Sequence, residues 1–371
     1  MKLLACFALV MAAVPASAQR AVIETETAYR SAPRLQLVET ARWCRDAEAP
    51  GCDFASVSEA IATNEGGLLA ANYRGPIRQF NRAGAFVREV SRKGAGPGEY
   101  RFVHSLQIRG QQLAWYDQAL RRVTRFDMAT GRPGESNAVN LPMALAGVYL
   151  VDGGDMVALE VPAATKAGDT VSAAFRVLNS ADPSSVLATV RQSSNYLQGS
   201  PVPVAQPLFS PGIVADVGWN KDVAHSSASR YEVSVYPSSG SPWRLKVNIP
   251  TRPVLSADRD SAIAEELRSS NVRTVAELAP EVQELIRRAR TAYPQLESLR
   301  VLRDGTLWIR PTPARGATVA RWDVFSRTGT RLGYAELPLS AAVKDGAERW
   351  ILAVVLQADD IPSVVRYDIR R

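Results

Sequence analysis

The sequence predicts an all-β protein, and three observations carry that prediction. Short runs of β-prone residues, broken by Gly, Asp, Asn and Pro, fill most of the 371 residues. Helical periodicity is confined to one region, residues 256–294. An apolar run that ends in an aromatic residue or leucine, a polar residue and a small turn recurs six times. Six similar units of this kind predict a six-bladed β-propeller.

The repeat is defined by one apolar anchor in each unit, and each anchor follows a strand that is entered through a turn. Successive anchors are 46, 52, 58, 89 and 42 residues apart. Four-stranded propeller blades are about 40–50 residues long, so the spacing of 89 indicates one blade plus an insertion. The anchors are Phe80, Phe126, Leu178, Tyr236, Phe325 and Tyr367.

The insertion, residues 256–294, is predicted to form two helices between blades four and five. Ser256 or Asp258 can cap the first helix, and Pro280 suits the first turn of the second, which Pro294 ends. Connections from an outer strand to the next inner strand share one face of a propeller. We therefore expect the insertion to lie on that face and partly to cover the entrance of the channel.

The N-terminus has the pattern of a secretory signal, residues 1–18. Lys2 precedes an apolar segment, Leu3–Val14, and Ala16-Ser17-Ala18 forms a cleavage site. The mature chain, residues 19–371, is predicted to be one propeller in the periplasm or outside the cell. It contains no later segment long and apolar enough to cross a membrane.

The ring is predicted to close through the N-terminus, because the chain ends only a few residues after Tyr367. The last blade would otherwise have three strands and an open edge. The stretch 34–40, RLQLVET, alternates polar and apolar residues and is predicted to be the outer strand of that blade. Cys44 and Cys52 follow it, and in an oxidising compartment they are expected to form a disulfide. The alternative is two free buried thiols.

The stretch Lys93–Tyr100, KGAGPGEY, first suggests a phosphate-binding loop. A P-loop requires G-x-x-x-x-G-K-[ST] before a helix, whereas here the lysine precedes the glycines and the following residues, RFVHSLQI, indicate a strand. We therefore interpret the stretch as a turn from the outer strand of blade one to the inner strand of blade two. Glu99 is expected to accept hydrogen bonds from backbone N–H groups of this turn.

This turn, with the strand pair after it, resembles a six-bladed β-propeller family of bacterial exported proteins related to NHL-repeat propellers. The family carries a GxGPGEY/F turn followed by hYDxxxxRhxxFDxxG in the next blade. The resemblance implies the fold more than a chemistry, and it is weaker in blades three and four. The matching residues are Gly94, Gly96, Pro97, Gly98, Glu99, Tyr100, Tyr116, Asp117, Arg122, Phe126, Asp127 and Gly131.

The candidate binding residues follow from the place of the turn, since propellers bind ligands mostly at the channel mouth on the face of such connections. They are Arg92, Lys93, Glu99, Arg101 and His104. The mature chain has one other histidine, His225, so a three-histidine zinc site is excluded. No serine-hydrolase motif is found. No metal and no cofactor are therefore predicted.

Charge and composition limit the classes of partner that the protein is expected to bind. The net charge is +7, but the basic residues are scattered, so nucleic acid is not an expected partner. We expect a monomer that binds a small molecule, peptide or protein at the channel face without catalysis. The alternative is a propeller enzyme, a lyase or hydrolase, with its site at the same mouth. A third possibility is an extracellular assembly scaffold.

Overall fold

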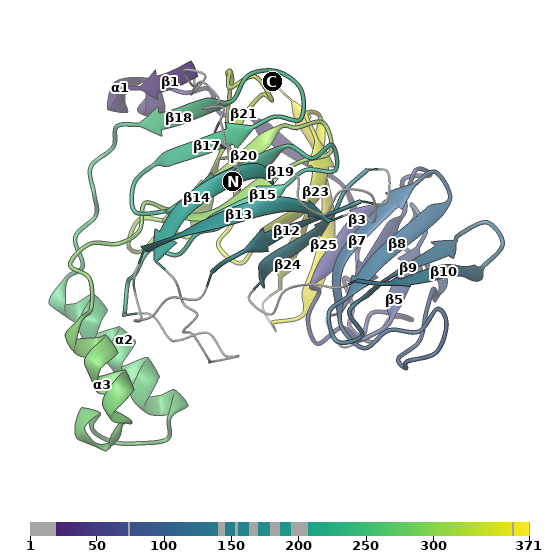
Figure 1. Cartoon of the computed structure of the whole chain (residues 1–371), viewed down its shortest axis with the longest axis horizontal. Helices are drawn as coiled ribbons and strands as arrows, with labels where there is room; N and C mark the ends of the chain where they lie inside the picture. Colours follow the sequence, from purple (N-terminus) through teal and green to yellow (C-terminus); the bar gives the residue numbers. More distant parts are fainter. Residues whose placement is uncertain are drawn as a thin grey trace, which may run out of the picture.

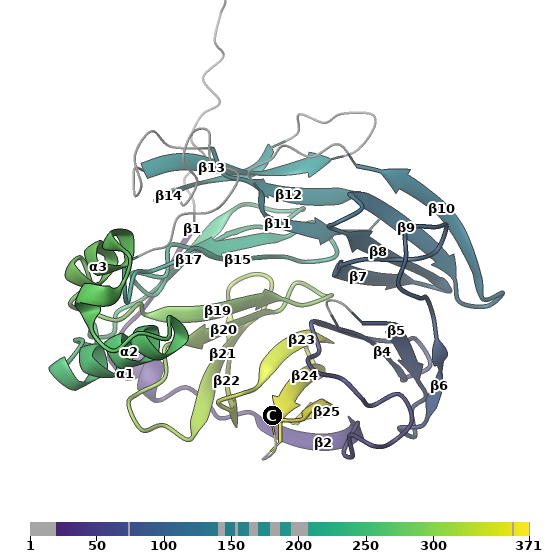
Figure 2. The ribbon, with the colours of Figure 1, turned by 90° about the horizontal axis from the view of Figure 1, so that it is seen from below.

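The computed structural model describes most of the chain after the predicted signal, and residues 1–18 lie outside the described residues. The strands form six sheets arranged in a ring, and Figure 2 looks onto this ring. The fold is therefore the predicted six-bladed β-propeller, with the first strand of each blade nearest the centre. The described residues are 20–72, 75–139, 145–152, 155–162, 170–178, 186–193, 207–357 and 360–370.

The first three blades are each antiparallel sheets of four consecutive strands. Blade one comprises β3 (Glu59–Ala62), β4 (Leu68–Ala71), β5 (Ile77–Phe80) and β6 (Phe86–Glu89). Blade two comprises β7 (Val103–Arg109), β8 (Gln112–Asp117), β9 (Arg122–Asp127) and β10 (Arg132–Ala138). Blade three comprises β11 (Leu145–Leu150), β12 (Met156–Glu160), β13 (Thr170–Leu178) and β14 (Val186–Ser193).

The last three blades each involve an N-terminal segment. Blade four comprises β15 (Val214–Val217), β16 (Val223–Ser226), β17 (Glu232–Tyr236) and β18 (Trp243–Val247). Blade five comprises β19 (Leu296–Val301), β20 (Leu307–Pro311), β21 (Val319–Phe325) and β22 (Arg331–Pro338). Blade six comprises β23 (Ala342–Ala347), β24 (Trp350–Leu356), β25 (Pro362–Arg370) and β2 (Gln36–Trp43).

The N-terminal residues form a belt, residues 20–43, along the outer strands of blades four, five and six. β1 (Arg20–Glu24) pairs in parallel with β18 of blade four and adds a fifth strand that the sequence did not suggest. Leu35 then bonds through its backbone N–H to Tyr334 O, in β22 of blade five, at 2.7 Å. β2 pairs antiparallel with β25, which confirms the predicted closure of the last blade. A short helix, α1 (Glu26–Arg30), lies between the first two contacts.

The apolar core is divided among the junctions between blades. Six buried clusters are found among the described residues, and each combines side chains from two neighbouring blades. Every sequence anchor lies on the third strand of its blade and packs in the cluster shared with the preceding blade. Phe325 of blade five, for example, packs with blade four, and Phe80 of blade one packs with blade six. The repeat was visible because each junction needs one such side chain.

The helical insertion contains α2 (Ser256–Ser269), the 3₁₀ turn η1 (Val275–Glu277) and α3 (Pro280–Arg287), and it connects β18 to β19. Figures 1 and 2 both show α2 and α3 at the periphery beside blades four and five. The expectation that the insertion covers the channel entrance is therefore wrong. Two contacts fix the ends of this region: Arg252, just before the insertion, donates to Pro313 O, and Arg290 N donates to Leu208 O.

The predicted disulfide joins Cys44 to Cys52 directly after β2. Both cysteines are buried and pack with Trp43 and Phe54 in the cluster between blades six and one. The disulfide therefore fixes the segment that closes the ring.

Candidate functional site

The glycine-rich turn, Lys93–Tyr100, joins β6 to β7 and is held by its own glutamate. Glu99 Oε2 accepts a hydrogen bond from Gly96 N at 2.7 Å, and Oε1 accepts one from Arg92 Nε at 2.7 Å. These contacts, that from the Gly96 N–H first, lower the pKa of Glu99. A Cβ on Gly94 would lie 2.0 Å from Glu99 Oε2, so a larger residue at this position would force the carboxylate to move. The carboxylate accepts a backbone N–H of the kind that an anion-binding loop offers to a phosphate.

Arg122 completes this turn from the neighbouring strand β9. Its guanidinium donates to Ala95 O at 3.0 Å, to Gly96 O at 2.7 Å and to Glu99 O at 2.8 Å. Backbone carbonyls of the turn are thereby satisfied by a side chain. These contacts explain physically why the glycines, the glutamate and the later arginine occur together in the sequence pattern.

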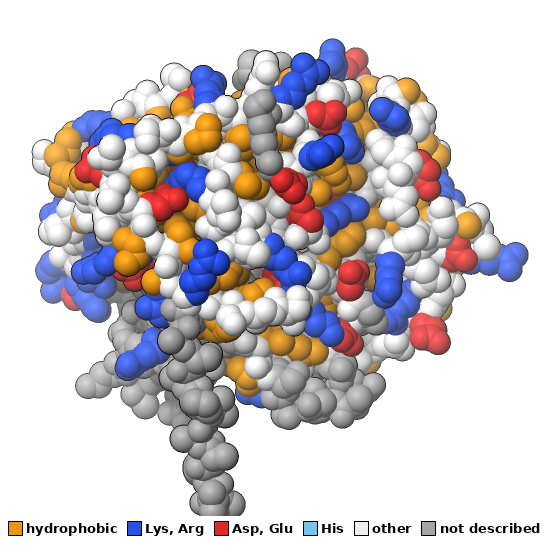
Figure 3. All heavy atoms as spheres, turned by 90° about the horizontal axis from the view of Figure 1, so that it is seen from above, with side chains coloured by type: hydrophobic (Ala, Val, Ile, Leu, Met, Phe, Trp, Pro, Cys, Tyr) orange, Lys and Arg blue, Asp and Glu red, His pale blue; other side chains and the backbone are white. Residues whose placement is uncertain are grey.

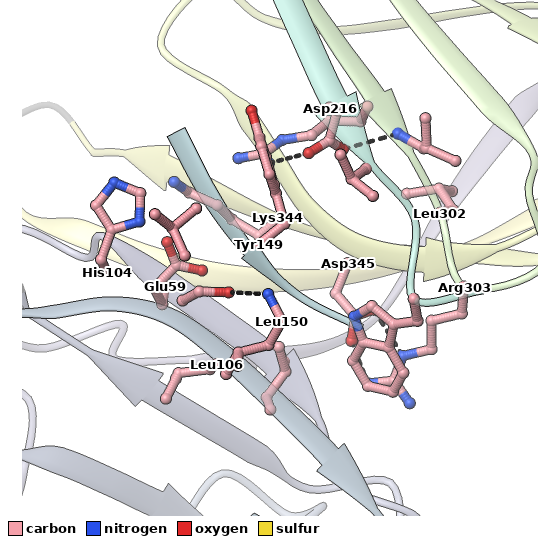
Figure 4. A pocket seen from close by; sticks show the side chains of 17 residues that line it. Glu59, His104, Leu106, Tyr149, Leu150, Asp216, Leu302, Arg303, Lys344 and Asp345 are labelled. Atoms are coloured by element: carbon pink, nitrogen blue, oxygen red, sulfur yellow. Dashed lines mark hydrogen bonds and ion pairs between the residues drawn. The ribbon is translucent and has the colours of Figure 1, made fainter. Parts of the chain in front are cut away.

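The central channel holds a cavity of about 210 Å³ that is lined by residues from the first strand of every blade. Each of these strands places at least one titratable side chain in the lining, and β23 places two, Lys344 and Asp345. One such side chain per blade gives a set of two acids, three bases and a tyrosine, five of which Figure 4 labels. The six, one from each blade in order, are Glu59, His104, Tyr149, Asp216, Arg300 and Lys344.

Two of these side chains occupy β-bulges. The register of β7 against β8 shifts between Val103 and Ser105, and that of β23 against β24 shifts between Val343 and Asp345. His104 and Lys344 are the extra residues at these two shifts. A bulge inserts an unpaired residue and re-aims its side chain. Figure 4 shows His104 and the end of Lys344 converging on the side of the cavity where Glu59 lies.

Asp216 and Arg300 form the fixed part of the cavity wall. Asp216 accepts a hydrogen bond from Val301 N at 2.8 Å and from Arg300 Nη1 at 3.4 Å, while Arg300 Nε donates to Val343 O at 3.0 Å. Burial raises the pKa of Asp216, and Arg300 opposes this shift. The pair therefore links blades four, five and six and already satisfies much of its own hydrogen-bonding capacity.

Glu59, His104 and Lys344 are less completely satisfied. Burial raises the pKa of Glu59 to about 7, against the attraction of Lys344 and Arg300. Burial also lowers the pKa of His104, and it lowers that of Lys344, with Arg300 repelling the ammonium. His104 Nδ1 is buried without a hydrogen-bond partner. Displaced pKa values on enclosed groups of a cavity are a physical sign of a functional site.

The end of the channel at the turns between first and second strands is narrowed by Arg303. Its guanidinium lies 4.0 Å from the centre of the Trp219 ring and forms an ion pair with Asp345. Arg303 Nη2 also donates to Ala62 O at 2.8 Å, and Asp345 Oδ2 accepts from Ala62 N at 2.8 Å. This group of residues connects blades four, five, six and one. Glu59 and His104 lie toward the opposite end, where the outer-to-inner connections run.

Of the five binding residues predicted from the sequence, only His104 lines the cavity. Arg92, Lys93 and Arg101 are exposed on the turn, and Glu99 is bound within it. The sequence analysis missed the other titratable residues of the channel. Most of them are polar residues in the short first strands, and comparing the first strands of all repeats would have suggested these. Lys344 is an exception, because a bulge determines its direction.

Three further observations concern possible partners. Among the described residues, no helix is long and apolar enough to span a membrane, and no three His, Cys, Asp or Glu side chains are grouped to hold a metal. On the face seen in Figure 3, Lys and Arg side chains are interspersed with Asp and Glu side chains. That face therefore offers no continuous basic surface of the kind that nucleic-acid binding uses.

Comparison with known proteins gives a consistent fold. The family described as 6-bladed beta-propeller matches residues 58–160, from β3 to β12. No curated protein matches the chain in sequence. A putative exported protein from Bacteroides fragilis has a similar structure, with 13% identity and a TM-score of 0.53 over 95% of this chain and 99% of that chain. Virginiamycin B lyase from Staphylococcus aureus is more distant, with 12% identity and a TM-score of 0.43 over 90% of this chain and 99% of that chain.

The family match and the structure from Bacteroides fragilis agree with the order of strands in the six sheets. At 13% identity, that structure shows the fold and not an activity. The family match, the similar exported protein and the sheet order together establish that this chain is a six-bladed β-propeller, as its sequence predicted.

Proposed function

We propose that this protein is exported and binds a small polar molecule in its central channel without transforming it. The observation that carries this proposal is the channel cavity to which every blade contributes a titratable side chain. Ligand sites are concave and contain a few convergent polar groups, and this cavity has both properties. Its volume of about 210 Å³ is below the usual range for drug-sized ligands, which favours a small molecule over a peptide or protein.

Export is supported by the pattern of residues 1–18 and by the Cys44–Cys52 disulfide, which suits an oxidising compartment. The periplasm and the extracellular space both fit this chemistry. The similar protein from Bacteroides fragilis is itself described as a putative exported protein.

Thermal-shift screening of the purified protein against a library of small polar molecules tests the proposal. Two sets of variants locate any binding: Lys344→Met in the channel, and Arg92→Ala and Lys93→Ala on the glycine-rich turn. Lys246→Met, on the outer strand β18, is the matched control. We expect ligand-induced stabilisation that is lost in the channel variant and retained in the others. Binding that is lost only in the turn variants would place the site on the turn and contradict the proposal.

An enzyme, a lyase or hydrolase, is the second candidate, and one observation favours it. The pKa of Glu59 near 7 would let its carboxyl group donate or accept a proton at neutral pH, as a general acid or base must. Incubating each binding molecule with the protein and analysing it by mass spectrometry separates the two functions. Recovery of the unchanged ligand supports binding alone, and conversion that is abolished by Glu59→Gln supports the enzyme.

A further inference from the structure

The polar groups of the channel that lack partners define what a ligand must supply, and this inference rests on the proposed function. Three of the six titratable side chains carry unused hydrogen-bonding capacity on one side of the cavity. They are Glu59, His104 and Lys344, and Figure 4 shows them directed toward one another. The remaining three are engaged: Asp216 and Arg300 bond to each other, and the Tyr149 hydroxyl lies 3.4 Å from Ala215 O.

Two of these groups, Glu59 and His104, require hydrogen-bond donors from a ligand. His104 Nδ1 is buried without a hydrogen-bond partner. In the neutral ring that carries its proton on Nε2, Nδ1 is an acceptor. Among the described residues, none donates a hydrogen bond to the Glu59 carboxylate, whose surroundings act on it only through charge and burial. This side of the cavity therefore presents two acceptors with no donor between them.

The third group requires an acceptor. Lys344 Nζ donates to Ser58 O at 2.7 Å. An ammonium group has three donors, so two remain for other acceptors. Arg300 adds a second positive charge nearby. Its charge acts on both groups, repelling the Lys344 ammonium and attracting the Glu59 carboxylate. The side of the cavity near Lys344 is thus suited to a negatively charged acceptor.

We propose that the channel ligand is a small zwitterion of the amino-acid class, with an N–H-bearing ammonium group and a carboxylate. The ammonium group donates to Glu59 and to His104 Nδ1, and the carboxylate accepts from Lys344. A ligand with one charge alone would leave either the two acceptors without a donor or two donors of the Lys344 ammonium group without an acceptor. Leaving a buried polar group unpaired is costly, so the arrangement selects against such ligands.

Isothermal titration at pH 8 with a matched panel tests this assignment. L-Alanine and other free amino acids carry both groups, whereas propionate and propylamine carry one each. Glycine betaine keeps both charges but has no N–H donor, and glycerol carries neither charge. We expect one amino-acid molecule bound per chain, and binding of the other four probes weaker by about ten-fold to a hundred-fold, as the loss of hydrogen bonds to charged groups implies.

Channel variants provide the second measurement. Glu59→Gln, His104→Phe and Lys344→Met are each expected to weaken amino-acid binding about ten-fold or more, while the control Lys246→Met leaves it unchanged. Circular dichroism and urea unfolding confirm that each variant is folded. Comparison of alanine with betaine on the unmodified protein does not depend on any variant.

The outcomes separate this inference from the proposed function. If betaine, propionate or glycerol binds as tightly as the amino acids, or if no amino acid binds, the zwitterion assignment is overturned. A different library molecule whose stabilisation is lost in Lys344→Met would still support binding in the channel. If no molecule depends on the channel residues, both the assignment and the proposed function are contradicted.

Discussion

Replacing Glu59 with glutamine is expected to stabilise the protein above neutral pH. Burial raises the pKa of Glu59 from its usual 4.5 to about 7, so the folded state holds a proton that the unfolded chain releases between these values. Stability is therefore lost as pH rises from 4.5 through 7. Each pKa unit corresponds to about 1.4 kcal/mol, so the shift gives an upper limit of about 3.5 kcal/mol for the destabilisation by ionised Glu59. Solvent in the channel screens part of this, and we expect about 1–3 kcal/mol.

Urea unfolding of the wild type and Glu59→Gln at pH 5 and pH 8 measures this effect. The two proteins should differ little at pH 5, and the variant should be more stable at pH 8 by the stated amount. Other titrating groups are shared by both proteins and cancel in the difference. Glu48→Gln, which removes an exposed carboxylate, is the control and should show no such pH dependence. A difference that does not change with pH, or a variant less stable at pH 8, would refute the reasoning.

Three further predictions concern the scaffold. Arg303→Ala leaves Asp345 buried without its ion pair and should lower the free energy of unfolding, measured in urea, by about 2–4 kcal/mol. Arg303→Lys should restore only part of this loss, because lysine keeps the charge but not the two-point contact with Asp345 or the stacking on Trp219. A loss below about 0.5 kcal/mol in Arg303→Ala would contradict the role of this ion pair. Gly94→Ala brings a Cβ onto the Glu99 carboxylate and should lower the free energy of unfolding by about 1–3 kcal/mol. In a double-mutant cycle with Glu99→Ala, the second substitution should remove part of this loss. Strictly additive effects would argue against the clash. Replacing both Cys44 and Cys52 with serine should lower the free energy of unfolding by about 2.5 kcal/mol, because the unfolded chain is no longer constrained by the loop. Dithiothreitol should lower the stability of the wild type and leave that of the variant unchanged.

The sequence predicted the parts of the fold that repeat in every blade. Phe80 and its five counterparts were visible because each blade junction needs a large apolar side chain at the same place in the third strand. The closing strand was predictable because a three-stranded last blade leaves an open edge. The fifth strand of blade four, β1, was missed because five residues next to a predicted signal segment carry no pattern that identifies their parallel partner β18.

The site was less predictable, because its residues come from six strands far apart in the sequence. His104 was found through its closeness to the glycine-rich turn and not through its own surroundings. Lys344 could not be predicted to face the channel, since a bulge determines its direction and bulges leave no clear mark on a single sequence. The exposed residues of the turn, such as Lys93, were chosen for their position on a face, which says little about the channel interior.

The belt formed by residues 20–43, whose elements β1, α1 and β2 are labelled in Figure 2, has a consequence for the order in which the protein acquires its structure. These residues leave the ribosome and any export channel first, yet their partner strands β18, β22 and β25 belong to the second half of the chain. Gln36 and Arg370, for instance, are paired across almost the whole sequence. The ring can therefore be completed only after the last residues have arrived, and contacts so distant in sequence form slowly. The N-terminal segment therefore cannot fold into its final place while the rest of the chain is being made. A chain that lacks its last strands cannot close its last blade.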